Sequence, residues 1–285
     1  MSAGLATILG AGAILLWATL ATLTVLTGVI PPFETTALAF AIGASVVALA
    51  AVARGRAHLM RPTPASLALG VYGLFGYHSL YFAALRLAPP AEAQLICSLW
   101  ALLIVLLSGL LPGNRLRPSH VVGALLGLLA ASLLVWPKLG AGTADARSVL
   151  GFALAFGCAL VWSSYSVASR LFAAVPSESV AVPCLLTSVL AFICSWLFEQ
   201  WIWPDGAVAW LALAALGLGP VGAAFLLWDI GMKNGDVSLL GVLSYASPIV
   251  ATALLVALGL AAPTWALAAA CGLMVLGAVP ATRYG

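Results

Sequence analysis

Charged side chains are too few in this chain to cover the surface of a soluble globule. Eleven basic and eight acidic residues make up 7% of its 285 residues, against about 25% in soluble domains. Glu34 is the first charged residue, and none lies between Val237 and Thr282. Most of the surface must therefore face a lipid bilayer, and the net charge of +3 gives no reason to expect a nucleic-acid partner.

Charged residues, prolines and glycines divide the chain into ten apolar stretches. A helix needs about 20 apolar residues to cross the hydrocarbon core, and it satisfies its own backbone hydrogen bonds there. The sequence therefore predicts an all-α integral membrane protein with ten transmembrane helices. The predicted spans are 3–29, 35–53, 64–84, 92–112, 119–136, 149–171, 179–201, 207–230, 237–259 and 264–281. The first span lacks a basic leader and is too long for a cleaved signal, so we expect it to be retained.

Basic residues are unequally distributed between the two sides of the predicted bundle. If the amino terminus is cytoplasmic, eight of the eleven basic residues lie on cytoplasmic segments and three on the other side. The positive-inside rule then predicts a multi-pass protein of a bacterial-type inner (plasma) membrane with both termini cytoplasmic. Five tryptophans would form an aromatic belt near the outer interface: Trp136, Trp201, Trp203, Trp210 and Trp265.

The two halves of the chain carry similar short motifs in the same order. Trp17, near the middle of the first span, corresponds to Trp162 in the sixth span. Residues 84–86 (Ala-Leu-Arg) parallel residues 231–233 (Gly-Met-Lys), each near the end of a span. These matches indicate an internal duplication.

A further match fixes the register of this duplication. Residues 99–103 fall on residues 246–250 at an offset of 147. The predicted repeats are residues 1–137 and 138–285, joined in one membrane domain. Five helices per repeat is an odd number, so the second repeat must be inverted. Inverted repeats are typical of alternating-access transporters, which bind substrate near the midplane between the repeats.

With these features the chain resembles the drug/metabolite transporter superfamily, in particular its EamA-type exporters and, among them, the YddG-type amino-acid exporters. The resemblance rests on the 5+5 helix pattern, the paired tryptophans, the Ala-Leu-Arg element and the Ser-Pro-Ile-Val segment at 247–250. It implies export of amino acids or related small metabolites, aromatic ones included, with broad specificity. One departure is that Ala101 stands where Pro248 stands in the second repeat, so a proline hinge is not expected in the first repeat.

Aromatic and polar side chains deep within spans are the candidates for substrate contact. Buried tyrosines and tryptophans need hydrogen-bond partners that lipid does not offer, so we expect them to face a polar cavity or one another. Tyr77, His78 and Tyr81 share one side of a helix by their spacing. The predicted substrate-binding residues are Trp17, Tyr77, His78, Tyr81, Trp100, Trp162, Tyr165, Ser244 and Tyr245. The alternative for each aromatic is helix packing, and for His78 it is a structural hydrogen bond to a neighbouring helix.

Two prolines inside spans, Pro220 and Pro248, are candidate hinges for gating, because a proline kinks a helix and frees carbonyl groups. The five cysteines are scattered through apolar stretches, which predicts neither disulfides nor a metal site. No cofactor is expected.

Other classes of protein fit the sequence less well. An intramembrane enzyme would need a nucleophile, a metal set or an acid–base pair, and the sequence has no HExxH, GxSxG or paired intramembrane carboxylates. A P-loop is also missing, so ATP hydrolysis is not expected. The sequence favours a facilitator that binds a small, amino-acid-like substrate. A proton-coupled drug/metabolite antiporter that uses His78 and a non-transporting membrane scaffold remain as alternatives, and the oligomeric state is open.

Overall fold

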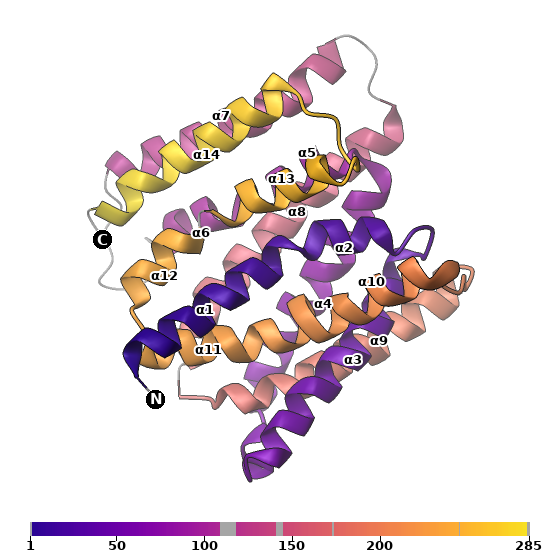
Figure 1. The fold of residues 1–285 in the computed structure, drawn as a ribbon, viewed down its shortest axis with the longest axis vertical. Helices are drawn as coiled ribbons and strands as arrows, with labels where there is room; N and C mark the ends of the chain where they lie inside the picture. Colours follow the sequence, from indigo (N-terminus) through magenta and orange to yellow (C-terminus); the bar gives the residue numbers. More distant parts are fainter. Residues whose placement is uncertain (1, 109–117, 141–144, 173, 245, 284–285) are drawn as a thin grey trace.

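The computed structural model describes residues 2–108, 118–140, 145–172, 174–244 and 246–283, and these ranges fold into a helical bundle without strands (Figure 1). The first half contains α1 (Ala3–Ala18), α2 (Leu20–Leu26), α3 (Pro32–Ala53), α4 (Pro64–Leu87), α5 (Pro90–Cys97), α6 (Trp100–Ser108) and α7 (Pro118–Gly140). The second half contains α8 (Ala146–Ser169), α9 (Ala181–Phe198), α10 (Gly206–Leu218), α11 (Ala224–Asn234), α12 (Val237–Ser244), α13 (Ser247–Ala257) and α14 (Trp265–Arg283). The predicted all-α class is confirmed.

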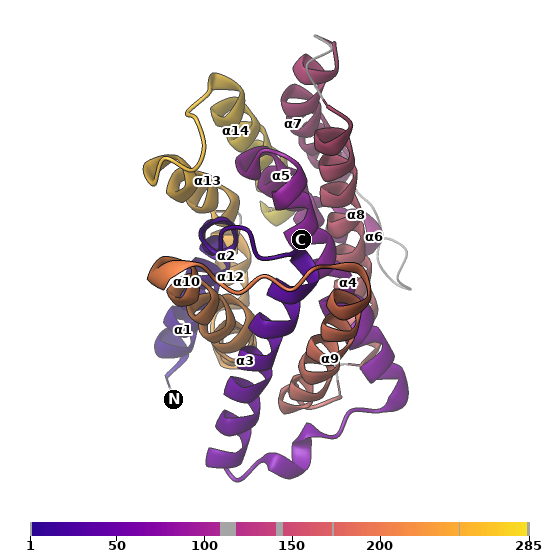
Figure 2. The ribbon, with the colours of Figure 1, turned by 90° about the vertical axis from the view of Figure 1, so that its right-hand side faces the viewer.

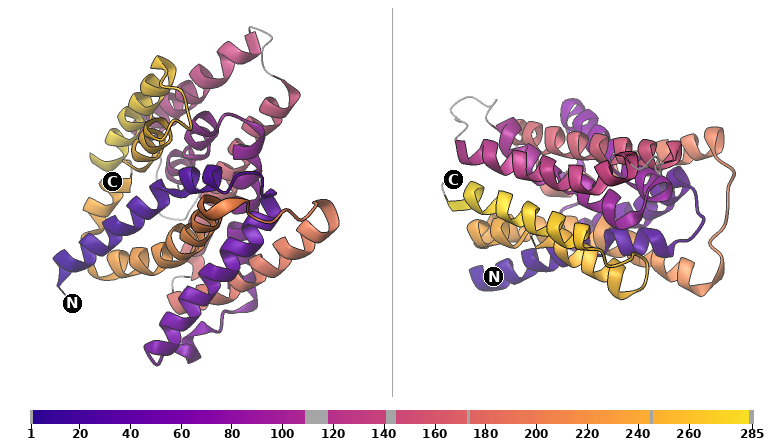
Figure 3. Two further views of the ribbon diagram at one scale, coloured as in Figure 1. Left: turned by 45° about the vertical axis from the view of Figure 1, so that its right-hand side comes forward. Right: turned by 90° about the horizontal axis from the view of Figure 1, so that it is seen from above.

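Within the described ranges, five helices are long and apolar enough to cross a membrane. They are Ala3–Leu26, Pro32–Ala53, Ala146–Ser169, Ser177–Phe198 and Gly206–Trp228. Shorter apolar helices are Pro90–Ile104, Val121–Trp136, Ser247–Ala257 and Trp265–Gly277. The chain is therefore an integral membrane protein, while the count of ten crossings remains a prediction. The beginning of α1 and the end of α14 lie on the same side of the bundle (Figures 1 and 3).

Four helix pairs make the most extensive contacts, and each joins the first half of the chain to the second. α4 packs on α8, α3 on α9, α7 on α14 and α1 on α11. Figure 1 shows α1 beside α11 and α7 beside α14, and Figure 2 shows α4 next to α8. Glycines permit two of these close approaches. A Cβ on Gly123 would overlap the carbonyl oxygen of Gly277, and a Cβ on Gly231 would lie 2.7 Å from the Cα of Gly10. The core of the bundle is thus an interface between the halves.

Polar groups hold α3 against α9 at both ends of the pair. The Glu199 carboxylate, just after α9, accepts hydrogen bonds from the backbone N–H groups of Phe33 (2.9 Å) and Glu34 (3.0 Å) at the start of α3. At the other end Arg56 forms a 3.0 Å ion pair with Glu178. The four orphan N–H groups that every helix start exposes explain why a carboxylate is favourable beside α3.

Two spans are interrupted at equivalent positions. Between α5 and α6, the Leu99 N–H donates to the carbonyl of Ile96 (3.1 Å). Between α12 and α13, the Ala246 N–H donates to the carbonyl of Leu243 (3.0 Å). Both bonds span three residues instead of the four of an α-helix, and both partners are related by the predicted offset of 147.

The interruption does not depend on proline. Pro248 lies in the first turn of α13, where a missing N–H costs no helix hydrogen bond. Ala101 occupies the matching place in α6, and the first-half helix is interrupted there as well. The absence of a first-half proline therefore does not remove the break, while the absence of a proline hinge in the first repeat remains a prediction.

Candidate substrate cavity

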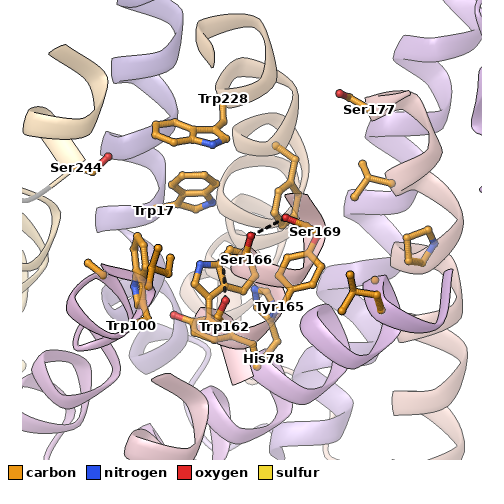
Figure 4. Close-up of a pocket in the computed structure, with 18 of the residues that line it drawn as sticks. Trp17, His78, Trp100, Trp162, Tyr165, Ser166, Ser169, Ser177, Trp228 and Ser244 are labelled. Atoms are coloured by element: carbon orange, nitrogen blue, oxygen red, sulfur yellow. Dashed lines mark hydrogen bonds between the residues drawn. The ribbon is translucent and has the colours of Figure 1, made fainter. Parts of the chain in front are cut away.

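A cavity of about 670 Å³ lies between the two halves of the bundle. Among the α-helices, its walls come from α1, α2, α4, α5, α6, α8, α9, α11, α12, α13 and α14. The residues labelled in Figure 4 all line it: Trp17, His78, Trp100, Trp162, Tyr165, Ser166, Ser169, Ser177, Trp228 and Ser244. This volume lies in the range of pockets that enclose small organic ligands.

The structure brings seven of the nine predicted substrate-binding residues to the cavity wall. They are Trp17, Tyr77, His78, Trp100, Trp162, Tyr165 and Ser244. Pro248 lines the cavity too, whereas Pro220 does not. Tyr81 does not line the cavity and is fully buried behind its wall. Tyr245 lies outside the described residues.

One wall is a cluster of rings on α4 and α8. The ring of Trp162 lies 4.9 Å from that of Tyr77, 6.4 Å from that of His78 and 5.3 Å from that of Tyr165. A glycine allows this contact, because a Cβ on Gly73 would overlap the ring of Tyr165. Tilted and edge-on aromatic contacts of this kind stabilise a preformed aromatic surface.

His78 is held in one tautomer by its own helix. Its Nδ1 lies 2.9 Å from the carbonyl oxygen of Leu74, which can only accept, so in the neutral ring the proton is assigned to Nδ1. The ring also makes an edge contact with Phe40 at 4.7 Å. The structural bond expected from a neighbouring helix is thus supplied by α4 itself. Nε2 is left as the acceptor of the ring.

A second wall is formed by α1 and α11. Trp17 lies 5.3 Å from Trp228 and 6.2 Å from Phe225, and Figure 4 shows Trp17 and Trp228 together, apart from His78, Trp162 and Tyr165. The indole N–H of Trp17 donates to the carbonyl of Pro220 (3.2 Å). Trp17 therefore has a protein partner for its N–H and offers a substrate only its ring.

The Pro220 carbonyl can accept the Trp17 hydrogen bond because Pro220 lies in a π-helical turn at Gly219–Ala223, between α10 and α11. Proline lacks the N–H that an α-helix would use there, and a wider turn leaves carbonyl groups available to other donors. Pro220 is buried in this turn, which packs against α3 and α1, and it does not line the cavity. The structure thus shows what its carbonyl binds, while a hinge role remains a prediction.

The sequence reasoning missed a polar site formed by Gln94 and Ser98, which both line the cavity. The Tyr81 hydroxyl donates to Gln94 Oε1, and Gln94 Nε2 donates to Ser98 Oγ (3.2 Å). Tyr81 therefore orients an amide that faces the cavity, instead of facing it directly. The four-residue spacing of Gln94 and Ser98 within an apolar span was the signal that could have revealed this site.

Comparison with known proteins identifies the chain. The EamA-like transporter family matches it twice, over residues 4–136 and 149–282. The chain belongs to the EamA-like transporter family. It is therefore a membrane transporter and not an enzyme.

One relative of this EamA-like transporter and one solved structure extend over almost its whole length. The aromatic amino acid exporter YddG of Ancylobacter novellus is 55% identical, over 99% of this chain and 98% of its own. A protein of the same name from Salmonella typhimurium is 29% identical over 62% of this chain and 61% of its own. A solved crystal structure that is 54% identical superposes with a TM-score of 0.78, covering 99% of this chain and 98% of the other.

The cavity of this EamA-like transporter extends toward one side of the bundle. Pro62 and Ser66, where α4 begins, and Phe172 and Ser177, just beyond α8, belong to its wall. By contrast, the connections at 27–31, 88–89, 199–205 and 258–264 contribute no residue to the wall. We refer to the first side as the open side and to the second as the closed side.

Proposed function

We propose that this transporter exports amino acids, aromatic ones included, through the cavity between its halves. The observation that carries the proposal is the composition of the cavity wall, with clustered rings on two helix pairs and a polar site at Gln94 and Ser98. The name of the 55% identical relative, aromatic amino acid exporter, supports the same substrate class.

The wall fits a zwitterion with a large side chain. A substrate ring can pack on Trp17, Trp162 or Tyr77, gaining dispersion and burying apolar area. An ammonium group can bind over an indole face. Within the described ranges, the indole N–H groups of Trp100 and Trp162 have no protein acceptor, so they are free to donate to a carboxylate.

Charge also selects the substrate class. No Asp, Glu, Lys or Arg belongs to the wall of the described cavity. A substrate with net charge would therefore lose its hydration without gaining a counter-ion, which is costly at membrane depth. A zwitterionic amino acid fits this wall better than an organic phosphate.

The proposed architecture is ten transmembrane helices in two inverted repeats, 1–137 and 138–285. Three observations support it: the family matches the chain twice, the two interruptions are related by the offset of 147, and the helix pairs are symmetric. Exchanging the halves turns the α1–α11 pair into the α8–α4 pair and leaves α3–α9 and α7–α14 paired with themselves. Alternating access about this two-fold relation is the transport mechanism that we propose.

Orientation and energetics complete the proposal. Both termini are cytoplasmic, as the basic residues indicate, and the open side is then the cytoplasmic side. The transporter works as a facilitator, since His78 is the one ionisable side chain on the described cavity wall apart from tyrosines. A proton-coupled antiporter that uses His78 is the second candidate.

Purified protein in liposomes tests the substrate class directly. We expect labelled phenylalanine, tyrosine and tryptophan to exchange across the membrane, while a labelled organic phosphate of similar size does not. Protein-free liposomes provide the leak control. Exchange of the phosphate with no exchange of any amino acid would overturn the proposal.

A further inference from the structure

A single side-chain hydrogen bond joins α2 to α4 on the closed side. Arg86, near the end of α4, donates from Nη2 to Thr27 Oγ1 at 2.6 Å, and Thr27 is only 1% exposed. The Thr27 hydroxyl also donates to the carbonyl of Thr24 (2.7 Å), so it both donates and accepts. Thr27 is thus positioned as the acceptor of a charge-assisted bond between two spans.

The guanidinium of Arg86 has little else to bind. Its Nε is buried without a partner among the described atoms. The ion pair in the described ranges is Arg56 with Glu178, at the other end of the molecule. A partly buried cation without a counter-ion raises the free energy of the state that buries it, and the bond to Thr27 is its compensation.

The relation between the halves gives this contact a functional meaning. The offset of 145 that relates Trp17 to Trp162 places Thr27 on Phe172, and the offset of 147 places Arg86 on Lys233. Phe172 lines the cavity where it reaches the open side. The Thr27–Arg86 contact on the closed side therefore corresponds, in the other half, to the place where the cavity reaches the open side.

We infer that Thr27 and Arg86 form the gate of the closed side. Their hydrogen bond holds α2 on α4 while the cavity faces the open side, and it breaks when the transporter turns to the other side. The guanidinium is then hydrated, which compensates for the lost bond and keeps the gate reversible. The inference rests on the alternating access of the proposed function but not on the identity of the substrate.

Labelling of a cavity cysteine from each side tests the gate without any substrate. Ala101 lines the cavity and is replaced by cysteine as a reporter. A membrane-impermeant thiol reagent is added to right-side-out and inside-out membrane vesicles, and the labelling rate is compared with that of the chain without the reporter. In the parent, which carries only the Ala101→Cys change, the reporter cysteine should be labelled rapidly from the open side and slowly from the closed side.

Thr27→Val removes the acceptor and leaves Arg86 buried without compensation. Labelling from the closed side should rise by about 10-fold, the scale of one hydrogen bond to a charged group. Thr27→Ser keeps the hydroxyl and should label like the parent. Thr36→Val is the matched control, because the buried Thr36 hydroxyl donates only within α3, to the carbonyl of Pro32 (2.8 Å). Should Thr27→Val fail to insert, Thr27→Ala replaces it.

A double-mutant cycle separates a gate from local destabilisation. In an Arg86→Met background the bond is already gone, so adding Thr27→Val should leave closed-side labelling unchanged. Open-side labelling at the parent rate shows that each variant is folded. Closed-side labelling that stays at the parent rate in Thr27→Val, or that rises equally with and without Arg86, would overturn the gate. Because no amino acid is present, a failed substrate panel leaves this result intact.

Discussion

The tryptophans of the cavity differ in whether the protein supplies a hydrogen-bond acceptor for the indole N–H group. Trp17 donates its N–H to Pro220, whereas Trp100 and Trp162 have no acceptor within the described ranges. An indole whose N–H already has a protein acceptor offers a substrate only its ring, while an indole without one can also donate a hydrogen bond to the substrate. The two kinds of tryptophan should therefore respond differently to changes in the substrate's carboxylate.

Most of these residues could be predicted from the sequence, because burial of an indole or phenol in lipid without a partner is unfavourable at any position. Tyr81 follows the same rule, but its partner is Gln94 and not the cavity. Which partner a buried hydroxyl finds depends on how α4 meets α5, and hydrophobic patterning does not contain that information. The spacing of Gln94 and Ser98 marks a polar pair within an apolar span, but it does not show that Tyr81 is the partner of Gln94.

Removal of the Tyr81 hydroxyl tests its role as a positioning group. In Tyr81→Phe the Gln94 amide loses the donor that orients it, so substrate binding should weaken by about 3–10-fold. Binding of labelled phenylalanine to purified protein measures the effect.

Tyr72→Phe is the control for this substitution. It deletes a tyrosine–serine bond of 2.8 Å to Ser164 on an exposed face away from the cavity, and its affinity should stay within about twofold of the parent. If the two variants bind phenylalanine with equal affinity, Tyr81 does not position Gln94 for substrate binding.

At the scale of elements, the two candidate hinge prolines occupy different positions. Pro248 begins α13, where its missing N–H is one of the orphan groups of any helix start. Pro220 lies inside a buried π turn that supplies the acceptor for Trp17. The sequence marks both as prolines within spans, and only the local hydrogen bonds distinguish them.

This difference predicts opposite outcomes for alanine substitution. Pro220→Ala restores an N–H that can bond to the Leu216 carbonyl, tightening the turn and moving the acceptor away from Trp17, so transport should fall on the order of 10-fold. Pro248→Ala should change transport by less than about twofold. Initial rates of labelled phenylalanine uptake into liposomes measure both. A larger effect for Pro248→Ala would show that the proline itself opens the α12–α13 break.

At the scale of the whole molecule, the sequence predicts the helical class and the order of the spans from hydrophobicity alone. It does not predict which spans meet. The pairing of α1 with α11 depends on Gly10 and Gly231, whose backbones approach across 221 positions of sequence. Hydrophobicity likewise does not determine which side is open, because that depends on which helix ends meet.

The same cavity wall predicts transport without a proton gradient. No carboxylate belongs to the described wall, and the Nδ1–H group of His78 donates a hydrogen bond to the Leu74 carbonyl. Counterflow of labelled phenylalanine should therefore proceed with equal pH on both sides and continue after a proton ionophore is added. Loss of counterflow with intact vesicles would favour the proton-coupled antiporter, and His78→Gln would then be the variant to test.

The central claim is that an aromatic cavity between the two halves binds the transported amino acid. Counterflow of labelled phenylalanine in liposomes, at equal amounts of inserted protein, tests it with Trp100→Ala, Trp162→Ala and Trp203→Ala. Removing a ring from the wall should cost about 1–3 kcal/mol of binding, a loss of roughly 5–100-fold, in the first two variants. Trp203 is 63% exposed and away from the cavity, so its variant should exchange like the parent. Normal exchange by both Trp100→Ala and Trp162→Ala would contradict the account.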